Sequence, residues 1–319
     1  MEMPCGGRQR CLKCRVKASG ELSPLTQRER ELLTPEEIAA GVRFACMTEL
    51  RGDARVELPA ASASQRIVTA GSMPDFPLCP WERGVGAAVD IGTTTLALYL
   101  YDLEKGRLLA TGSERNPQAV FGADVISRLE KALAGEGEAL AASIRGGIAR
   151  LLGESCAQAA VEREAVKALV LTGNTAMLYL LCGQNPASIA AAPFRQDRYF
   201  GEFLPASALG LPLAEGARIY LPRCISAYVG GDITTALMAA GFDRKLEIAA
   251  SEPELLVDIG TNGEMALAAG GRLLCCSTAA GPAFEGAGIY QGMNAKEGAV
   301  SRVALADGEI RCEVIGGGE

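Results

Sequence analysis

The sequence Val89-Asp90-Ile91-Gly92-Thr93-Thr94-Thr95 has a near copy in Val257-Asp258-Ile259-Gly260-Thr261-Asn262-Gly263. Each copy reads as a β-strand that ends in an aspartate, then a tight glycine turn, then a second strand at residues 96–101 or 264–268. Such a turn points backbone N–H groups and hydroxyls at one spot, which suits a phosphate oxygen. The carboxylate at the strand end suits Mg²⁺. One copy alone could be an ordinary hairpin, but the internal repeat predicts two related half-domains that close on one nucleotide.

Composition limits the classes of protein to which the chain can belong. Its 319 residues allow about two domains, and a formal net charge of −7 argues against general binding of nucleic acid. No apolar run is long enough to span a bilayer, and Met1 begins no signal peptide, so we expect a cytoplasmic protein without a membrane segment. Eleven cysteines in a reducing compartment point to metal or redox chemistry. The absence of histidine excludes histidine-based triads and histidine metal ligands.

Four cysteines near the start of the chain form a candidate metal site. Cys5, Cys11, Cys14 and Cys46 are spaced C-x5-C-x2-C with a distant fourth member. This spacing is close to that of ferredoxins that bind a [2Fe–2S] cluster. A Cys₄ zinc site and reduced structural thiols remain as alternatives. Around the cysteines we predict a strand at residues 15–18 and a helix at 32–40 with Thr34 as its N-cap.

The rest of the chain reads as alternating strands and helices after a linker at residues 59–84. We predict helices at residues 121–129, 138–152 and 176–181 and strands at residues 166–171 and 218–221. Asp232 opens a helix at residues 233–240, where it is either the N-cap or a group that faces the nucleotide and orients a water or Mg²⁺. A loop of small residues follows at 279–288. Six other cysteines are expected to pack as small hydrophobic residues: Cys156, Cys182, Cys224, Cys275, Cys276 and Cys312.

Four further motifs accompany the cysteines and the two aspartate turns: Asn116-Pro117-Gln118, Gly122-Ala123-Asp124-Val125-Ile126-Ser127-Arg128, Gly173-Asn174-Thr175 and Gly281-Pro282-Ala283-Phe284-Glu285-Gly286-Ala287. As a set, these motifs resemble the reductive activators of corrinoid proteins. That family joins an N-terminal [2Fe–2S] domain to an ASKHA domain, the class of acetate and sugar kinases, Hsp70 and actin. The resemblance covers nearly the whole chain.

The resemblance implies an α/β fold: a ribonuclease H-like ASKHA domain at residues 85–319, preceded by a small β-grasp-like [2Fe–2S] segment at residues 1–58. It implies ATP-dependent return of a corrinoid from Co(II) to Co(I) on a partner protein of a methyltransferase system. The electron would come from ferredoxin or a similar donor and pass through the cluster. The reduction potential of a ferredoxin-like cluster lies at about −400 mV. ATP would drive the transfer through differential affinity for two conformations. The resemblance does not decide whether the protein forms a homodimer.

The same resemblance assigns roles to the residues of the two turns. Asp90 and Asp258 would be catalytic carboxylates that hold Mg²⁺ directly or through water, and Asp232, in the alternative in which it faces the nucleotide, would be the third. The phosphates of ATP would lie against the small residues of the turns: Gly92, Thr93, Thr94, Thr95, Gly260, Thr261, Asn262 and Gly263.

Three departures from the family pattern modify these expectations. Gln9 and Leu12 stand where the family has glycines, and a side chain at a positive φ is costly. Only four residues precede Cys5, so the ferredoxin segment is expected to be minimal or shortened. The adenosine-binding glycine motif is expected beyond Glu319, which predicts a shortened ASKHA domain.

Two other functions compete with the corrinoid reductase. One is a non-catalytic iron–sulfur electron carrier or redox sensor with a degenerate ASKHA domain, which the missing adenosine motif favours. The other is a small-molecule kinase of the ASKHA class, against which the cysteine segment argues, because kinases need no cluster.

Overall fold

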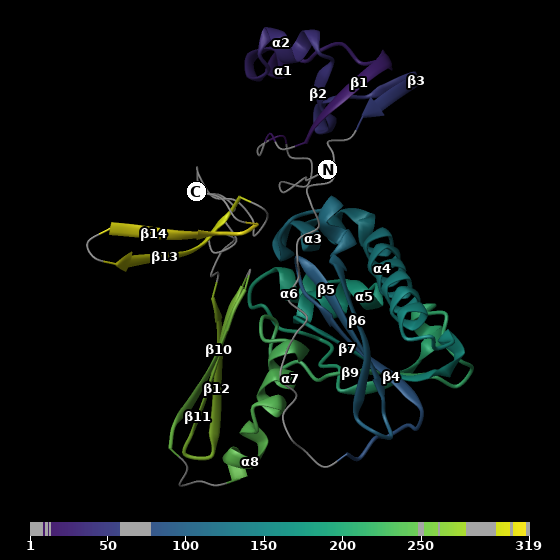
Figure 1. Cartoon of the computed structure of the whole chain (residues 1–319), viewed down its shortest axis with the longest axis vertical. Coiled ribbons are helices and arrows are strands. Elements are labelled where there is room, and N and C mark those ends of the chain that lie inside the picture. Colours follow the sequence, from purple (N-terminus) through teal and green to yellow (C-terminus); the bar gives the residue numbers. More distant parts are fainter. Residues whose placement is uncertain are drawn as a thin grey trace. The chain divides into compact units, whose positions relative to one another are not determined.

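The computed structural model (Figure 1) describes residues 9, 12, 14–57, 78–247, 252–260, 262–278, 298–306 and 309–316. The chain divides into two compact units: Met1–Arg66 with Ala119–Ala123 and Glu285–Glu319, and Ile67–Gln118 with Asp124–Phe284. Most of the predicted linker and the small-residue loop at 279–288 lie outside the described residues. The domain boundaries at residues 58 and 84 stay predictions.

The N-terminal part of the first unit is an antiparallel sheet with strand order β2-β1-β3 and two short helices. Its elements are β1 (Arg15–Leu22), α1 (Gln27–Leu32), α2 (Pro35–Ala39), β2 (Val42–Phe44), η1 (Ala45–Met47) and β3 (Leu50–Glu57). The same unit contains the hairpin β13 (Val300–Ala306) and β14 (Glu309–Val314). The strand predicted at residues 15–18 is confirmed and extends further.

The helix predicted at residues 32–40 is wrong in its first part, because two helices replace it. Thr34 caps α2 as predicted, and Thr26 caps the additional helix α1; both caps are capping boxes, closed by Glu37 and Glu29 respectively. Leu33 is extended and separates the two helices.

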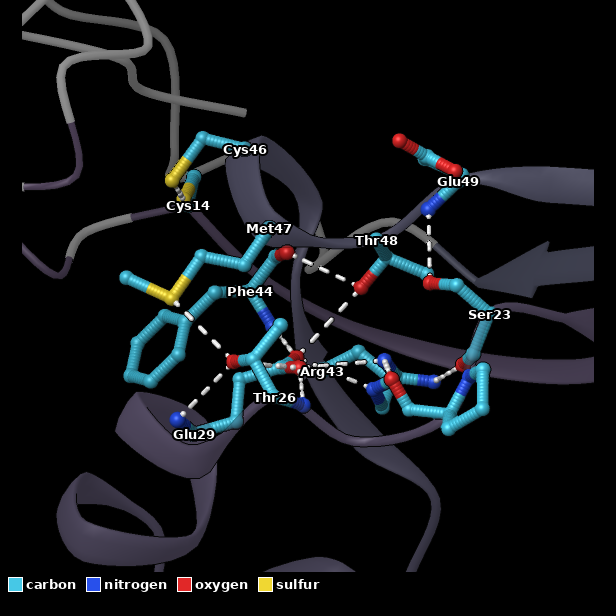
Figure 2. Close-up of polar contacts among 11 residues, drawn as sticks. Cys14, Ser23, Thr26, Glu29, Arg43, Phe44, Cys46, Met47, Thr48 and Glu49 are labelled. Atoms are coloured by element: carbon cyan, nitrogen blue, oxygen red, sulfur yellow. Dashed lines mark hydrogen bonds and ion pairs between the residues drawn. The ribbon is translucent and has the colours of Figure 1, made fainter.

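A buried ion pair holds this small sheet and its helices together (Figure 2). Glu29 is fully buried, and its two carboxylate oxygens accept hydrogen bonds from Arg43 Nε at 2.9 Å and Arg43 Nη2 at 3.0 Å. Glu29 also accepts from the backbone N–H of Thr26 at 2.9 Å and of Phe44 at 3.2 Å. Burial alone would raise the pKa of Glu29, but the bonds from Arg43, Thr26 and Phe44 outweigh it and lower the pKa to about 2. The pair fixes β2, and Cys46 is the second residue after that strand.

We expect Glu29→Gln to lower the stability of this sheet by about 2 kcal/mol, because the amide leaves the buried Arg43 charge without its partner. Amide hydrogen exchange of β1 and β2 in the whole chain measures the change. Glu37→Gln is the matched control: it also removes a capping-box glutamate, but its ion pair with Arg15, at 3.2 Å, is partly exposed, so we expect less than about 1 kcal/mol. Equal losses in the two variants would contradict the assignment.

The lowered pKa also gives a pH dependence. Glu29 has a pKa of about 2 when folded against 4.5 ordinarily, so its stabilisation is fully present above about pH 4.5 and is lost as the pH falls toward 2. Protection of β1 and β2 should therefore fall over that range in the wild type and change less in Glu29→Gln.

The second unit is built on a six-stranded sheet with strand order β6-β5-β4-β7-β9-β8 (Figure 1). The central strands β4, β7 and β9 are parallel to one another, whereas β5, β6 and β8 are antiparallel to their neighbours. The strand bounds are β4 (Val85–Ile91), β5 (Thr95–Asp102), β6 (Arg107–Arg115), β7 (Val166–Gly173), β8 (Glu202–Pro205) and β9 (Arg218–Leu221). On β5, alternate residues are buried, which places Leu96, Leu98 and Leu100 in the core at 0 % exposure.

Helices pack against this sheet, and the longest is α4 (Gly137–Gln158). Its apolar stripe is buried against β5 and β6, where Gly112 allows the close approach of Leu151. The other helical segments are η2 (Pro117–Val120), α3 (Val125–Lys131), η3 (Ala132–Glu136), η4 (Arg163–Ala165), α5 (Thr175–Cys182), α6 (Ala187–Ala190), η5 (Ala206–Leu209), α7 (Gly231–Ala239) and α8 (Phe242–Glu247). The predicted helices and strands of this region are confirmed, with α3 beginning later than expected because Asp124 is its N-cap.

A second sheet follows α7 and α8 in the same unit, with strand order β10-β11-β12. Its strands are β10 (Glu254–Ile259), β11 (Gly263–Ala269) and β12 (Arg272–Thr278). One face packs on the two helices through Ile233, Leu237, Phe242, Ala266 and Ala268. Among the described residues, no helix is long and apolar enough to cross a membrane.

Candidate functional site

Both copies of the aspartate motif form antiparallel strand–turn–strand units, β4–β5 and β10–β11, which confirms the predicted secondary structure of the repeat. The turns differ in length, because Ile91 pairs with Leu96 whereas Ile259 pairs with Gly263. Thr95 and Gly263 therefore begin strands rather than lie in the turns. Thr261 lies outside the described residues.

Steric space explains why residue 92, in the first turn, is glycine. A Cβ atom on Gly92 would lie 2.7 Å from the carbonyl oxygen of Thr95, a distance that real side chains do not adopt. A Cβ on Gly260 would meet the carbonyl oxygen of Asn262 at an ordinary 3.6 Å. A side chain at position 92 would therefore clash with the backbone, whereas position 260 has ordinary space for a Cβ atom.

Two more predicted motifs lie beside the first turn. β4 and β7 are parallel neighbours in which Ile91 pairs with Gly173, and a Cβ on Gly173 would lie 2.7 Å from the Ile91 carbonyl oxygen. Asn174 follows and donates from Nδ2 to Thr93 Oγ1 at 3.3 Å. Gly230, the N-cap of α7, packs so closely on Asn174 that a Cβ would lie 2.4 Å from its Cα. The ends of β4 and β7 and the start of α7 thus meet.

The carboxylates on these elements influence one another. Burial, followed by the charge of Asp258, raises the pKa of Asp90 to about 6. Burial also raises the pKa of Asp232 to about 6, against a hydrogen bond from the Ile233 N–H and with the charges of Asp90 and Asp258. Asp90 is nevertheless exposed, so water reaches it even though protein surrounds it. The three predicted carboxylates therefore come within electrostatic reach of each other, as a site for a cation requires.

Asp232 is not the N-cap of its helix. Gly230 has that position, and Asp232 lies in the first turn, where Oδ1 accepts from the Ile233 N–H at 2.8 Å. The N-cap alternative is therefore wrong.

Glu264 is a fourth carboxylate, which the sequence analysis did not select. It lies opposite Asp258 in the β10–β11 pair and is 6 % exposed. Burial and the charges of Asp232 and Asp258 raise its pKa to about 7, with a hydrogen bond from Ser277 opposing. The sequence signal that could have identified Glu264 is its position just after the second turn, because the return strand of a hairpin lies beside the strand that carries Asp258.

The carboxylates do not form a closed metal cage. Within the described part of the chain, no group of three or more Cys, Asp or Glu side chains is close enough together to hold a metal ion. The raised pKa values of Asp90, Asp232 and Glu264 fit carboxylates that face Mg²⁺, which keeps several of its waters and contacts one or two carboxylates.

The raised pKa values predict opposite effects of pH without and with Mg²⁺. Asp90, Asp232 and Glu264 bind protons more tightly in the folded than in the unfolded chain, so the stability of the metal-free protein should fall as the pH rises from about 4 to about 7. Mg²⁺ should raise the melting temperature at about pH 8, where these groups are ionised, and far less at about pH 5. Calorimetric melting with and without Mg²⁺ measures this, and an equal Mg²⁺ effect at both pH values would contradict it.

The structure brings two of the four predicted cluster ligands together. Cys14 Sγ and Cys46 Sγ are 3.2 Å apart (Figure 2). Two sulfurs at about 2.3 Å from one tetrahedral metal would be roughly 3.8 Å apart, so a small movement suffices for shared ligation of iron or zinc. Cys14 belongs to a buried core with Leu33, Phe44 and Met47, and the partly buried Cys46 packs against this core. Cys5 and Cys11 lie outside the described residues.

The two positions that lack the family glycines have the expected left-handed backbone. Gln9 has a φ of 59° and Leu12 a φ of 56°. This conformation costs about 1 kcal/mol or more for a residue with a side chain. Neighbouring groups offset part of it: Gln9 Nε2 donates to the Cys46 carbonyl oxygen at 3.4 Å, and Arg15 Nη1 donates to that of Leu12 at 3.0 Å.

The remaining cysteines follow the packing prediction only in part. Cys156 and Cys224 are buried, as expected, and Cys182 and Cys275 are partly buried. Cys276 and Cys312 are exposed, so the prediction is wrong for these two, which lie on outward positions of their strands.

The fold and the two aspartate turns define an α/β protein of the ASKHA class. Residues 85–245 match the profile of the RACo middle region, and residues 252–319 match that of the C-terminal domain of RACo, the ASKHA domain. The chain belongs to the RACo family, the reductive activators of corrinoid proteins.

Named relatives agree with this assignment. The chain is 34 % identical over 235 residues to the corrinoid activation enzyme RamQ of Eubacterium limosum, with 72 % of this chain and 38 % of RamQ covered. It is 30 % identical over 227 residues to the [Co(II) methylated amine-specific corrinoid protein] reductase of Methanosarcina barkeri, covering 68 % of this chain and 40 % of the relative. It thus spans about two fifths of these relatives.

A solved structure supports the fold over nearly the whole chain. It is a reductive activator for a corrinoid, iron–sulfur protein, similar with a TM-score of 0.65 and 27 % identity. The similarity covers 99 % of this chain and 64 % of that one.

Proposed function

We propose that this chain takes part in the ATP-dependent reductive activation of a corrinoid protein, in which Co(II) is returned to Co(I). Membership of the RACo family and the names of the two relatives support this function. The observation that carries the electron-transfer part is the approach of Cys14 Sγ and Cys46 Sγ, from distant parts of the sequence, to 3.2 Å. The proposed location is the cytoplasm, where such cysteines stay reduced.

The proposed cluster ligands are the four N-terminal cysteines: Cys5, Cys11, Cys14 and Cys46. A bound [2Fe–2S] cluster would supply a one-electron carrier at this position. The Glu29–Arg43 pair fixes the strand before Cys46, and the backbone N–H of Ala45 donates to the Cys14 carbonyl oxygen at 2.9 Å. Both contacts hold the two sulfurs together.

The proposed ATP site consists of the two turns and their carboxylates. Asp90, Asp258 and Asp232 would hold or orient Mg²⁺ and its waters, and the electrostatic coupling among them supports this role. The proposed phosphate-binding residues are Gly92, Thr93, Thr94, Thr95, Gly260, Thr261, Asn262 and Gly263. The proposed partners are a corrinoid protein and ferredoxin or a similar electron donor.

An anaerobic absorbance assay tests this function. The iron-loaded chain is mixed with a reductant and a Co(II) corrinoid protein of a methylamine methyltransferase system, the class named for the Methanosarcina barkeri relative. We expect the Co(I) spectrum to form with MgATP and to form much more slowly without nucleotide or with a non-hydrolysable analogue. Formation at the same rate in all three samples would contradict ATP dependence.

A second candidate is an iron–sulfur electron carrier that does not turn over ATP. The lack of a close three-carboxylate group in the described residues favours it. A redox-active cluster in a protein without ATPase activity, with and without the corrinoid protein, would establish this alternative.

A further inference from the structure

We propose that Arg128 is a positioning residue of the first turn, residues 92–94. From the buried side, its guanidinium holds and polarises the Thr93 peptide, so that the turn presents its N–H groups to a phosphate group. This inference rests on the proposed phosphate role of the turn and assigns a function to a residue that otherwise has none.

Two residues, Asn116 and Arg128, donate hydrogen bonds to three successive carbonyl oxygens of the turn. Gly92 O accepts from Asn116 Nδ2 at 2.7 Å, Thr93 O accepts from Arg128 Nη2 at 2.6 Å, and Thr94 O accepts from the Asn116 backbone N–H at 2.8 Å. All three peptides of the turn are therefore fixed in orientation by Asn116 and Arg128.

The two holding residues lie on the same side of the turn. Asn116 Nδ2 is 3.9 Å and Arg128 Nη1 is 3.4 Å from the sulfur of Met177, on α5. In a trans peptide the carbonyl and the following N–H point in opposite directions. The N–H groups of Thr93 and Thr94 are therefore directed away from this buried side, as a turn that receives an anion requires.

Arg128 is suited to polarise as well as to hold. Its side chain is 0 % exposed, and burial lowers its pKa to about 10, with the charge of Asp124 opposing and that of Arg115 adding to the shift. It therefore remains a cation at neutral pH. A charged donor makes a stronger hydrogen bond than a neutral one. Because Thr93 C=O and Thr94 N–H belong to one peptide, the bond strengthens that N–H as a donor.

The start of α3 fixes where this arginine enters. Asp124 caps the helix and accepts from the Ser127 backbone N–H at 2.8 Å and from its hydroxyl at 2.7 Å. Arg128 follows one turn later and points into the interior. The motif at residues 122–128 thus places the guanidinium of Arg128 on the buried side of the first turn.

Binding of Mg-tripolyphosphate and of MgATP, measured by titration calorimetry, tests the proposal. Arg128→Met removes the charge and the hydrogen bond at similar volume, and we expect about 10-fold to 100-fold weaker binding of both ligands. Arg128→Lys keeps the charge and should restore part of the affinity. Arg145→Met is the matched control, because Arg145 Nε also donates to a backbone carbonyl, that of Leu181 at 2.9 Å, but away from the turn. We expect its affinities within about twofold of the wild type.

The outcomes separate this proposal from the proposed function. Wild-type affinity in folded Arg128→Met overturns the positioning role, as does an equal loss in Arg145→Met. If Arg128→Met does not fold, Arg128→Lys decides: several-fold weaker binding supports the role, and unchanged binding overturns it. Wild-type protein that binds neither ligand also overturns it. Failure of corrinoid reduction alone, with the expected binding pattern intact, contradicts only the proposed function.

Discussion

Cys46→Ser should leave the protein with almost no bound iron, against about two iron atoms per chain in the reconstituted wild type. A [2Fe–2S] cluster needs its four protein ligands, and Cys46 is the proposed ligand that is most distant in sequence from the other three. Its sulfur is already 3.2 Å from that of Cys14. Cys14→Ser should have the same effect. Iron analysis and the visible absorbance of anaerobically reconstituted protein measure both variants.

Cys79→Ser and Cys312→Ser are the matched controls, because both cysteines are free and exposed and neither is a proposed ligand. We expect wild-type iron content in each. A wild type that carries zinc and takes up no iron would contradict the [2Fe–2S] assignment, although the same two cysteines could then be zinc ligands.

Asp90→Asn should reduce ATP hydrolysis by about 100-fold or more, because it removes the carboxylate at the end of β4 that we expect to hold Mg²⁺ or its water. The stability of the Asp90→Asn variant, in contrast, should increase. Burial and Asp258 raise the pKa of Asp90 to about 6, so its negative charge is unfavourable in the folded protein at about pH 8. The neutral asparagine removes that repulsion, and a higher melting temperature together with lost activity would exclude unfolding as the cause.

Asp102→Asn is the control for this experiment. Asp102 is at the other end of β5, where Oδ1 accepts from the backbone N–H of Glu104 and Lys105, both at 3.1 Å. We expect wild-type ATPase activity from this variant. Retained ATPase activity in Asp90→Asn would show that the first turn does not act through this carboxylate.

Local patterns were sufficient to predict the elements that carry the ASKHA turns. Apolar runs that end in aspartate and a glycine turn predicted β4–β5 and β10–β11, and the apolar run before Gly173 predicted β7. These signals are local because a strand and its turn are specified by consecutive residues.

The residues that sequence reasoning missed act through contacts between distant segments. Helix α1 has the polar sequence QREREL, and its Glu29 is buried where Arg43, fourteen residues later, pairs with it. Glu264 joins the carboxylates through strand pairing, and Arg128 reaches a turn 35 residues earlier in the chain. Single-sequence patterns assign charged residues to the surface, and only the folded chain shows which of them are paired inside.

Anaerobic EPR of a single mixture tests the central claim most directly. The mixture contains the iron-loaded chain, reduced beforehand, and a Co(II) corrinoid protein, and spectra are recorded before and after addition of MgATP. We expect the signal of the reduced [2Fe–2S] cluster and the signal of Co(II) to disappear together after MgATP is added, because one electron moves from the cluster to cobalt. Two signals that stay unchanged after MgATP, in a sample with confirmed cluster and corrinoid, would contradict it.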